Sequence, residues 1–94
     1  MIQVGGFQEK DLSATRSPEE IQEEEETIRF AIAYYERNFN EELGEVEKIE
    51  TQVVSGINYK IYFRKGDKTV KITVWVQSWT DTMEVVNVEE IDNQ

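Results

Sequence analysis

The spacing of apolar residues changes once along the chain, near Gly44, and this change limits the possible fold more than any other feature. Before it, apolar residues recur every three or four positions, which is typical of an amphipathic helix. After it, they alternate with polar residues in short runs separated by turns, which is typical of strands. Short turns join antiparallel neighbours, and a sheet with one apolar face needs a covering layer. The sequence therefore predicts an α+β fold, with one long helix packed across an antiparallel sheet of four or five strands.

The helix is predicted to begin at Ser17, which can cap it. Pro18 suits the first helical position, and Glu20 completes a capping box. We expect the helix to end between Asn38 and Asn40. Its predicted apolar face contains Ile21, Ile28, Ala31, Ile32, Tyr35 and Phe39. The acidic run at residues 23–26 is expected to lie mainly on the opposite, solvated face.

Four strands are expected in the rest of the chain, at residues 45–54, 59–64, 70–77 and 83–91. Gly66 supplies unusual backbone angles to the turn between the second and third of them. Residues 1–16 precede the helix and are expected to form a flexible N-terminal arm, because the Gly5-Gly6 pair has high backbone freedom. The chain shows no repeat and no linker, so residues 1–94 are expected to form one domain.

Composition argues against several classes of function. The 94 residues include no Cys and no His, which removes disulfides, thiolate metal ligands and the usual general base. The net charge of −10 opposes binding to phosphate backbones, so no nucleic-acid partner is expected. The apolar runs are too short to cross a bilayer, and no secretory signal is evident. We expect no catalytic residue, metal, cofactor or membrane association, and a cytoplasmic location unless a signal peptide was removed.

Residues 52–56, which read Gln-Val-Val-Ser-Gly, form the first tip, where the first two strands meet. Adjacent valines are unusual there, because turns favour Asn, Asp, Gly, Ser or Pro. One interpretation is that Val53 and Val54 are ordinary strand residues, one of them facing the core, and that Ser55 and Gly56 make the turn. The other interpretation is an apolar surface that docks into a partner.

Residues 78–82 form the second loop, which contains Trp79. An isolated loop Trp either folds back onto the sheet edge or is an exposed interface anchor. Two strands separate this loop from the first tip, so a simple meander places both at the same end of the sheet. The turn at residues 65–68 then lies at the opposite end. Tyr62 and Trp75 are expected to pack on a sheet face.

Three elements in this order resemble the cystatins, which inhibit papain-like cysteine proteases. The first tip resembles their QVVAG signature, Gly5-Gly6 resembles the glycine pair of their N-terminal arm, and Trp79 resembles the tryptophan of their second hairpin loop. The absence of Cys and residues 18–23 look like the disulfide-free stefins. Trp79 is similar to the secreted and plant branches, where Pro usually precedes it, whereas Ser78 stands here.

The resemblance implies a cystatin-like fold and a reversible, competitive inhibitor that occludes the protease cleft. The implied protease-binding residues are Val4, Gly5, Gly6, Gln52, Val53, Val54, Ser55, Gly56, Ser78 and Trp79. Val4 would fill an apolar subsite, the first tip would approach the catalytic cysteine, and Trp79 would lie on the primed side of the cleft.

Other outcomes stay open at this point. The fold could serve a natural or engineered binding module that does not inhibit proteases. Secreted cystatins can also bind legumain through a Ser-Asn-Asp segment after the helix, which Phe39-Asn40-Glu41 matches only at Asn40. We expect a monomer, or a domain-swapped dimer if the β-branched Val53-Val54 pair strains the hinge.

Overall fold

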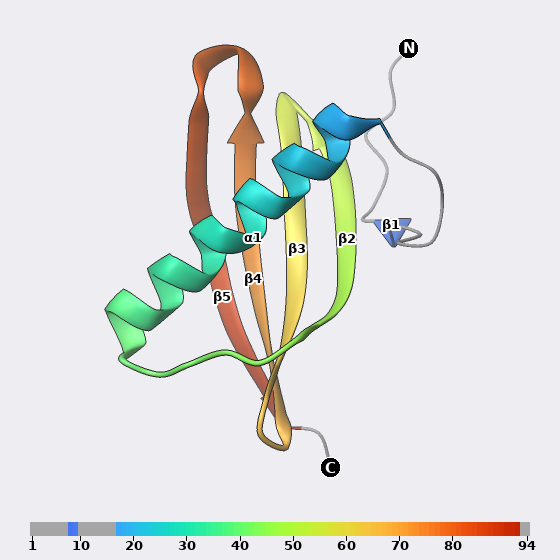
Figure 1. The fold of residues 1–94 in the computed structure, drawn as a ribbon. Helices are drawn as coiled ribbons and strands as arrows, with labels where there is room; N and C mark the ends of the chain where they lie inside the picture. Colours follow the sequence, from blue (N-terminus) through green and yellow to red (C-terminus); the bar gives the residue numbers. More distant parts are fainter. Residues whose placement is uncertain (1–7, 10–16, 93–94) are drawn as a thin grey trace.

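The predicted α+β fold is confirmed in the computed structural model, which describes residues 8–9 and 17–92 (Figure 1). Helix α1 (Pro18–Phe39) lies across one face of a five-stranded antiparallel sheet. The strands follow the order of the chain: β1 (Gln8–Glu9), β2 (Val46–Val54), β3 (Gly56–Lys65), β4 (Lys68–Gln77) and β5 (Thr82–Asp92). A short 3-10 helix, η1 (Ser78–Thr80), joins β4 to β5.

Within residues 1–16, which are predicted to form an N-terminal arm, Gln8 and Glu9 form the short strand β1. This edge strand pairs antiparallel with β2, with Gln8 opposite Thr51 and Glu9 opposite Glu50. Two residues are too few to show an alternating pattern, so this strand could not be predicted from local periodicity. The rest of the predicted arm lies outside the described residues.

The ends of α1 agree with the sequence prediction. The Ser17 side chain accepts a hydrogen bond from the Glu20 backbone N–H, and the Glu20 carboxylate accepts one from the Ser17 N–H. At the other end Asn40 adopts a left-handed conformation, with φ of 57°, and caps the helix. No helix in the described part of the chain is long and apolar enough to cross a membrane.

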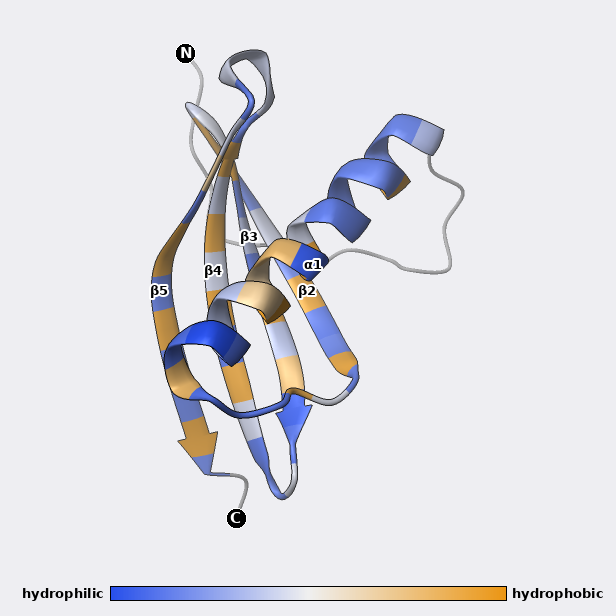
Figure 2. Cartoon of the chain, turned by 60° about the vertical axis from the view of Figure 1, so that its left-hand side comes forward, coloured by the Kyte–Doolittle hydropathy of each residue, from blue (hydrophilic) through white to orange (hydrophobic). Residues whose placement is uncertain are grey.

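The predicted apolar face of the helix is confirmed in its middle, where Ala31 and Tyr35 are buried and Ile28 and Ile32 pack against the core, but not at its two ends. Thr27 and Ala31 are fully buried and mark the line of closest packing, whereas Ile21 and Phe39 are exposed. The small side chains let the helix approach the sheet, and the Thr27 hydroxyl is satisfied by donating 2.7 Å to the Glu23 carbonyl oxygen. Figure 2 shows that the first turns of α1 are hydrophilic and that its apolar residues gather further along.

The acidic run follows the prediction only at Glu25 and Glu26, which are exposed. Glu24 is only 5% exposed and Glu23 is half-buried, so these two carboxylates face the sheet rather than solvent. Glu23 accepts a hydrogen bond from the Tyr59 hydroxyl on β3. Burial and this hydrogen bond raise the pKa of Tyr59 above its ordinary value. The polar pair thus fixes the N-terminal half of α1 on the sheet, where apolar side chains are few.

The main core lies between α1 and the sheet. Alternate residues of the three inner strands face it, and the buried apolar residues are Ala31, Tyr35, Ile49, Tyr59, Ile61, Phe63, Val70, Ile72, Val74 and Val76. β4 supplies four of them, which fits its position in the sheet and the clean alternation in its sequence. The core therefore makes a rigid base from which the turns project.

Removing the Tyr59 hydroxyl should destabilise the fold. Tyr59→Phe leaves the packed ring in place but takes the donor away from the half-buried Glu23 carboxylate, so the free energy of unfolding should fall by about 1–2 kcal/mol. Urea unfolding measures this, with Tyr34→Phe on the exposed side of α1 as the control. Equal midpoints for Tyr59→Phe and the wild-type protein would contradict the role given to the pair.

The sheet face away from α1 carries a polar cluster around Tyr62. Its hydroxyl donates 2.6 Å to the Glu50 carboxylate, and the Lys48 ammonium lies 4.4 Å from its ring centroid. Lys71, the partner of Tyr62 on β4, lies 5.7 Å from the same centroid. Burial and then the bond to Glu50 raise the pKa of Tyr62 to about 12.

This raised pKa predicts a loss of stability at alkaline pH. The folded protein keeps the Tyr62 proton up to about pH 12, whereas the unfolded chain loses it near the ordinary value of about 10. The contribution of Tyr62 to stability should therefore be fully present below pH 10 and decline between these two pKa values. Urea unfolding across this range should show a shallower decline for Tyr62→Phe than for Tyr34→Phe. Parallel declines would refute the assignment.

Candidate functional site

The first tip and the second loop lie at the same end of the sheet, as the meander predicts (Figure 1). β3 and β4 are paired along their whole length, from Ile57 opposite Val76 to Lys65 opposite Lys68. The turn at Gly66 and Asp67 consequently lies at the far end. Two loops far apart in sequence thus form one edge of the molecule.

The first tip is a very tight turn. β2 and β3 remain paired up to Val54 opposite Gly56, so Ser55 alone lies between the strands. Gly56 has a φ of 110°, and a Cβ there would lie 2.4 Å from the Val76 carbonyl oxygen. Only glycine fits both the backbone angle and the space. The apex is therefore packed directly against the end of β4.

Both valines of the first tip belong to β2, which is half of the simpler interpretation. The other half, that one valine faces the core, does not hold: the Val53 side chain is 68% exposed and Val54 is half-buried. Gln52 is half-buried beside them and accepts 3.4 Å from the Asn58 side-chain amide. The strand thus continues past the cover of α1 and carries an apolar side chain into solvent.

The second loop is an ordered turn that exposes its tryptophan. Ser78, Trp79 and Thr80 form η1, and the N–H of Asp81 donates 3.1 Å to the Ser78 carbonyl oxygen. Asp81 adopts a left-handed conformation with φ of 53°. Trp79 is 68% exposed, so it does not fold back onto the sheet. Of the two interpretations of this residue, the folded-back one does not hold, and a role as an interface anchor stays a prediction.

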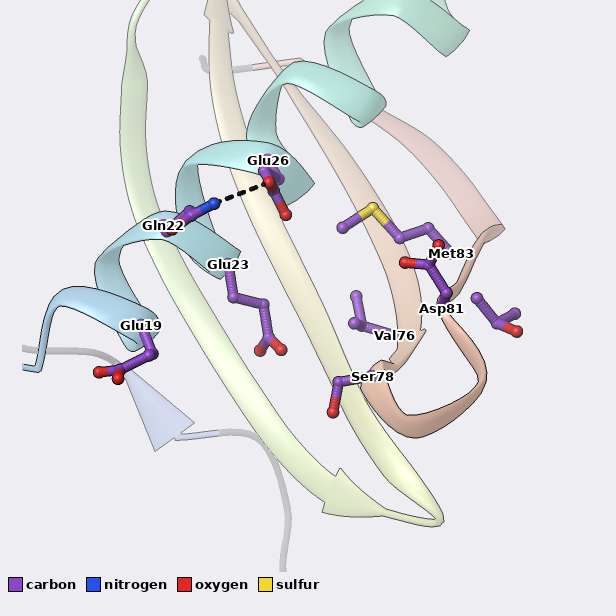
Figure 3. Close-up of a pocket in the computed structure, with 9 residues that line it drawn as sticks. Glu19, Gln22, Glu23, Glu26, Val76, Ser78, Asp81 and Met83 are labelled. Atoms are coloured by element: carbon purple, nitrogen blue, oxygen red, sulfur yellow. Dashed lines mark hydrogen bonds between the residues drawn. The ribbon is translucent and has the colours of Figure 1, made fainter.

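A shallow pocket of about 230 Å³ lies between the first turns of α1 and the second loop (Figure 3). Figure 3 shows Glu19, Glu23 and Glu26 on the helix side, facing Ser78 and Asp81 across the gap. Val76 and Met83 give it apolar walls, and the Gln22 amide bonds to Glu26 at 3.3 Å. Among the described residues, no group of three or more side chains is arranged to hold a metal ion.

The structure brings together seven of the ten predicted site residues, in the first tip and the second loop. Val4, Gly5 and Gly6 lie outside the described residues, so their part in the site stays a prediction. Asn40, the residue compared with legumain-binding segments, caps α1 at the far end of the helix and is exposed. The expected monomer or swapped dimer also stays a prediction.

Sequence reasoning missed two side chains that support the site. Trp75, expected only to pack on a sheet face, also donates from its indole N–H to the Ser55 carbonyl oxygen at 2.9 Å. Gln77 contacts Ser55 and Thr80 and so reaches both loops. The sequence feature that could have identified them is their position at the end of β4, next to the two loops.

Gly56 should tolerate alanine far less well than Gly66. Both have positive φ, but a Cβ on Gly66 would meet nothing within 4 Å. Gly66→Ala should therefore cost only the backbone strain, about 1–2 kcal/mol. Gly56→Ala should cost about 3 kcal/mol or more, because the overpacking against Val76 adds to that strain. Urea unfolding of the two variants tests this, and equal losses would show that the apex has room to relax.

No curated protein matched the sequence. The family model of the Cystatin domain matches residues 14–89, which is most of the chain and includes α1, both loops and most of β5. The absence of cysteine is consistent with the stefin-like branch. With a helix across an antiparallel sheet and this match, the chain belongs to the cystatin family of cysteine protease inhibitors.

Proposed function

We propose that this protein is a reversible, competitive inhibitor of papain-like cysteine proteases, which occludes the active-site cleft with the edge formed by the first tip and the second loop. The observation that carries the proposal is the pairing of two exposed apolar side chains at this edge. Val53 and Trp79 are each 68% exposed, on loops that share one end of the sheet.

Burial of these side chains in a cleft supplies the binding energy. Removing apolar surface from water contributes about 25 cal/mol per Å², and aromatic residues dominate interface hot spots. The loops are short and rest on a packed sheet, so little conformational entropy is lost when they bind. Among the described residues, the site offers shape and apolar surface rather than a catalytic group.

The first tip is suited to block a protease without being cut. A protease holds its substrate as an extended strand, but the backbone at Val54 and Gly56 is already paired within the hairpin. The tight turn also cannot be straightened without breaking the contact between Gly56 and Val76. Inhibition is then steric occlusion, and no bond is made or broken.

The N-terminal arm completes the proposal. β1 is antiparallel to β2, and Gln8 pairs closer to the first tip than Glu9 does. The Gln8 end of β1 is therefore the end nearer to the proposed binding edge. We propose that Val4, Gly5 and Gly6 add apolar contact and close backbone approach at the non-primed side of the cleft.

Titration of active papain with the folded protein tests the proposed function. Residual activity should fall to a plateau near zero, and activity should return on dilution with excess substrate, because occlusion is reversible. A folded sample that leaves papain fully active at micromolar concentration would overturn the proposal and favour a non-inhibitory binding module.

Trp79→Ala should weaken papain binding by about 2 kcal/mol or more, in the range of interface hot spots. Phe39→Ala is the matched control, since it removes an aromatic side chain that is 47% exposed at the opposite end of α1. Inhibition constants for both variants, with circular dichroism to show that each is folded, make the comparison. Similar inhibition constants for the two variants would remove Trp79 from the binding edge.

A further inference from the structure

The Gln77 side chain at the end of β4 reaches both loops of the binding edge. Its Nε2 donates to the carbonyl oxygen and to Oγ of Ser55 in the first tip, each at 3.4 Å. Its Oε1 accepts from the Thr80 hydroxyl of the second loop at 2.8 Å. The Thr80 hydroxyl is also 2.8 Å from that of Thr82. One amide group thus bridges two loops that do not adjoin each other in sequence.

The direction of these hydrogen bonds is fixed by their chemistry. A carbonyl oxygen only accepts, so the Gln77 NH₂ group must face Ser55. Its oxygen then faces the second loop and accepts the single proton of the Thr80 hydroxyl. The Thr82 hydroxyl then donates to Thr80, whose hydroxyl oxygen lies 2.8 Å away and whose carbonyl oxygen lies 3.3 Å away. The Thr80 hydroxyl also lies 3.2 Å from the main-chain carbonyl oxygen of Gln77, so its single proton is shared between two oxygens of that residue, and the side-chain oxygen is the nearer one.

The first tip is held from β4 by a second donor as well. The Trp75 indole N–H donates 2.9 Å to the same Ser55 carbonyl oxygen, and Gly56 packs against the Val76 backbone. The tip therefore stays in place without Gln77. The second loop depends more on Gln77 than the first tip does, because Thr80 and Trp79 are exposed and η1 begins directly after Gln77.

We propose that Gln77 is a positioning residue that fixes the second loop, and with it Trp79, relative to the first tip. The effect of Gln77 on protease binding rests on the proposed function. Losing the amide leaves the Ser55 carbonyl oxygen bonded to Trp75 and the Thr80 hydroxyl near the main-chain carbonyl oxygen of residue 77. Both residues are exposed, so water can replace the lost bonds. The fold should lose little stability, while Trp79 becomes free to move and must be ordered again on binding.

Papain inhibition by Gln77→Ala tests the role in binding. The affinity should fall by about three- to tenfold, which corresponds to ordering one mobile side chain. Thr80→Val should have a similar effect, and the double variant should be no worse than Gln77→Ala alone, because both substitutions break the same link. In a Trp79→Ala background, Gln77→Ala should have no further effect, which a general loss of stability would not reproduce.

Thr69→Val is the matched control. Its hydroxyl donates 3.0 Å to Glu47 near the opposite end of β4, so it loses a comparable bond far from the binding edge. Its affinity should equal that of the wild-type protein. Gln77→Glu keeps the acceptor for Thr80 and loses the donor for Ser55, so it should break the link between the two loops while keeping Thr80 bonded. Unchanged affinity for both Gln77→Ala and Thr80→Val would overturn the role in binding.

NMR relaxation of the Trp79 backbone and indole N–H groups tests the coupling without any protease. Both groups should become more mobile in Gln77→Ala and stay unchanged in Thr69→Val. The unfolding midpoint of Thr69→Val serves as the reference for any loss of stability in Gln77→Ala. If the wild-type protein does not inhibit papain, the proposed function fails, and this measurement alone decides whether Gln77 couples the loops. Equal mobility of the Trp79 N–H groups in the wild-type protein and in Gln77→Ala would overturn the coupling itself.

Discussion

The close packing of α1 on the sheet at Thr27 and Ala31 is the contact on which the rest of the structure depends. A chain with one helix must bury a whole sheet face with it, and large side chains along this line would hold the helix away from β4 and β5. The two small residues are fully buried and allow the approach. The inward-facing residues of the strands are buried against these two residues. The packed sheet then holds both loops in fixed positions.

The same packing explains how an exposed apolar edge can persist on a folded protein. The helix covers the middle of the sheet, while β2 and β3 continue beyond it to the tight turn at Ser55. Val53 and Trp79 then stand outside the core without weakening it. The fit of Gly56 against Val76 keeps the turn in place, so the apolar surface is presented by a rigid backbone rather than by a mobile loop.

The sequence was sufficient for features that depend on neighbours along the chain. The capping box at Ser17, the alternation in β4 and the placement of both loops at one end follow from local pattern and strand count. The rotation of α1 could not be predicted in this way, because the Tyr59 hydroxyl that draws Glu23 to the sheet lies 36 residues away. The roles of Trp75 and Gln77 depend likewise on contacts between strand and loop that no periodicity encodes.

The residue before Trp79 shows what those contacts contribute. A proline at this position would fix φ by its ring, independently of any neighbour. Ser78 does not, so the order of the second loop depends on the cap at Asp81 and on the bonds among Thr80, Thr82 and Gln77. Each such bond contributes only about 1 kcal/mol. The position of Trp79 is therefore set by several weak links that act together, and Gln77 matters because it alone, among the side chains described, joins those links to the first tip.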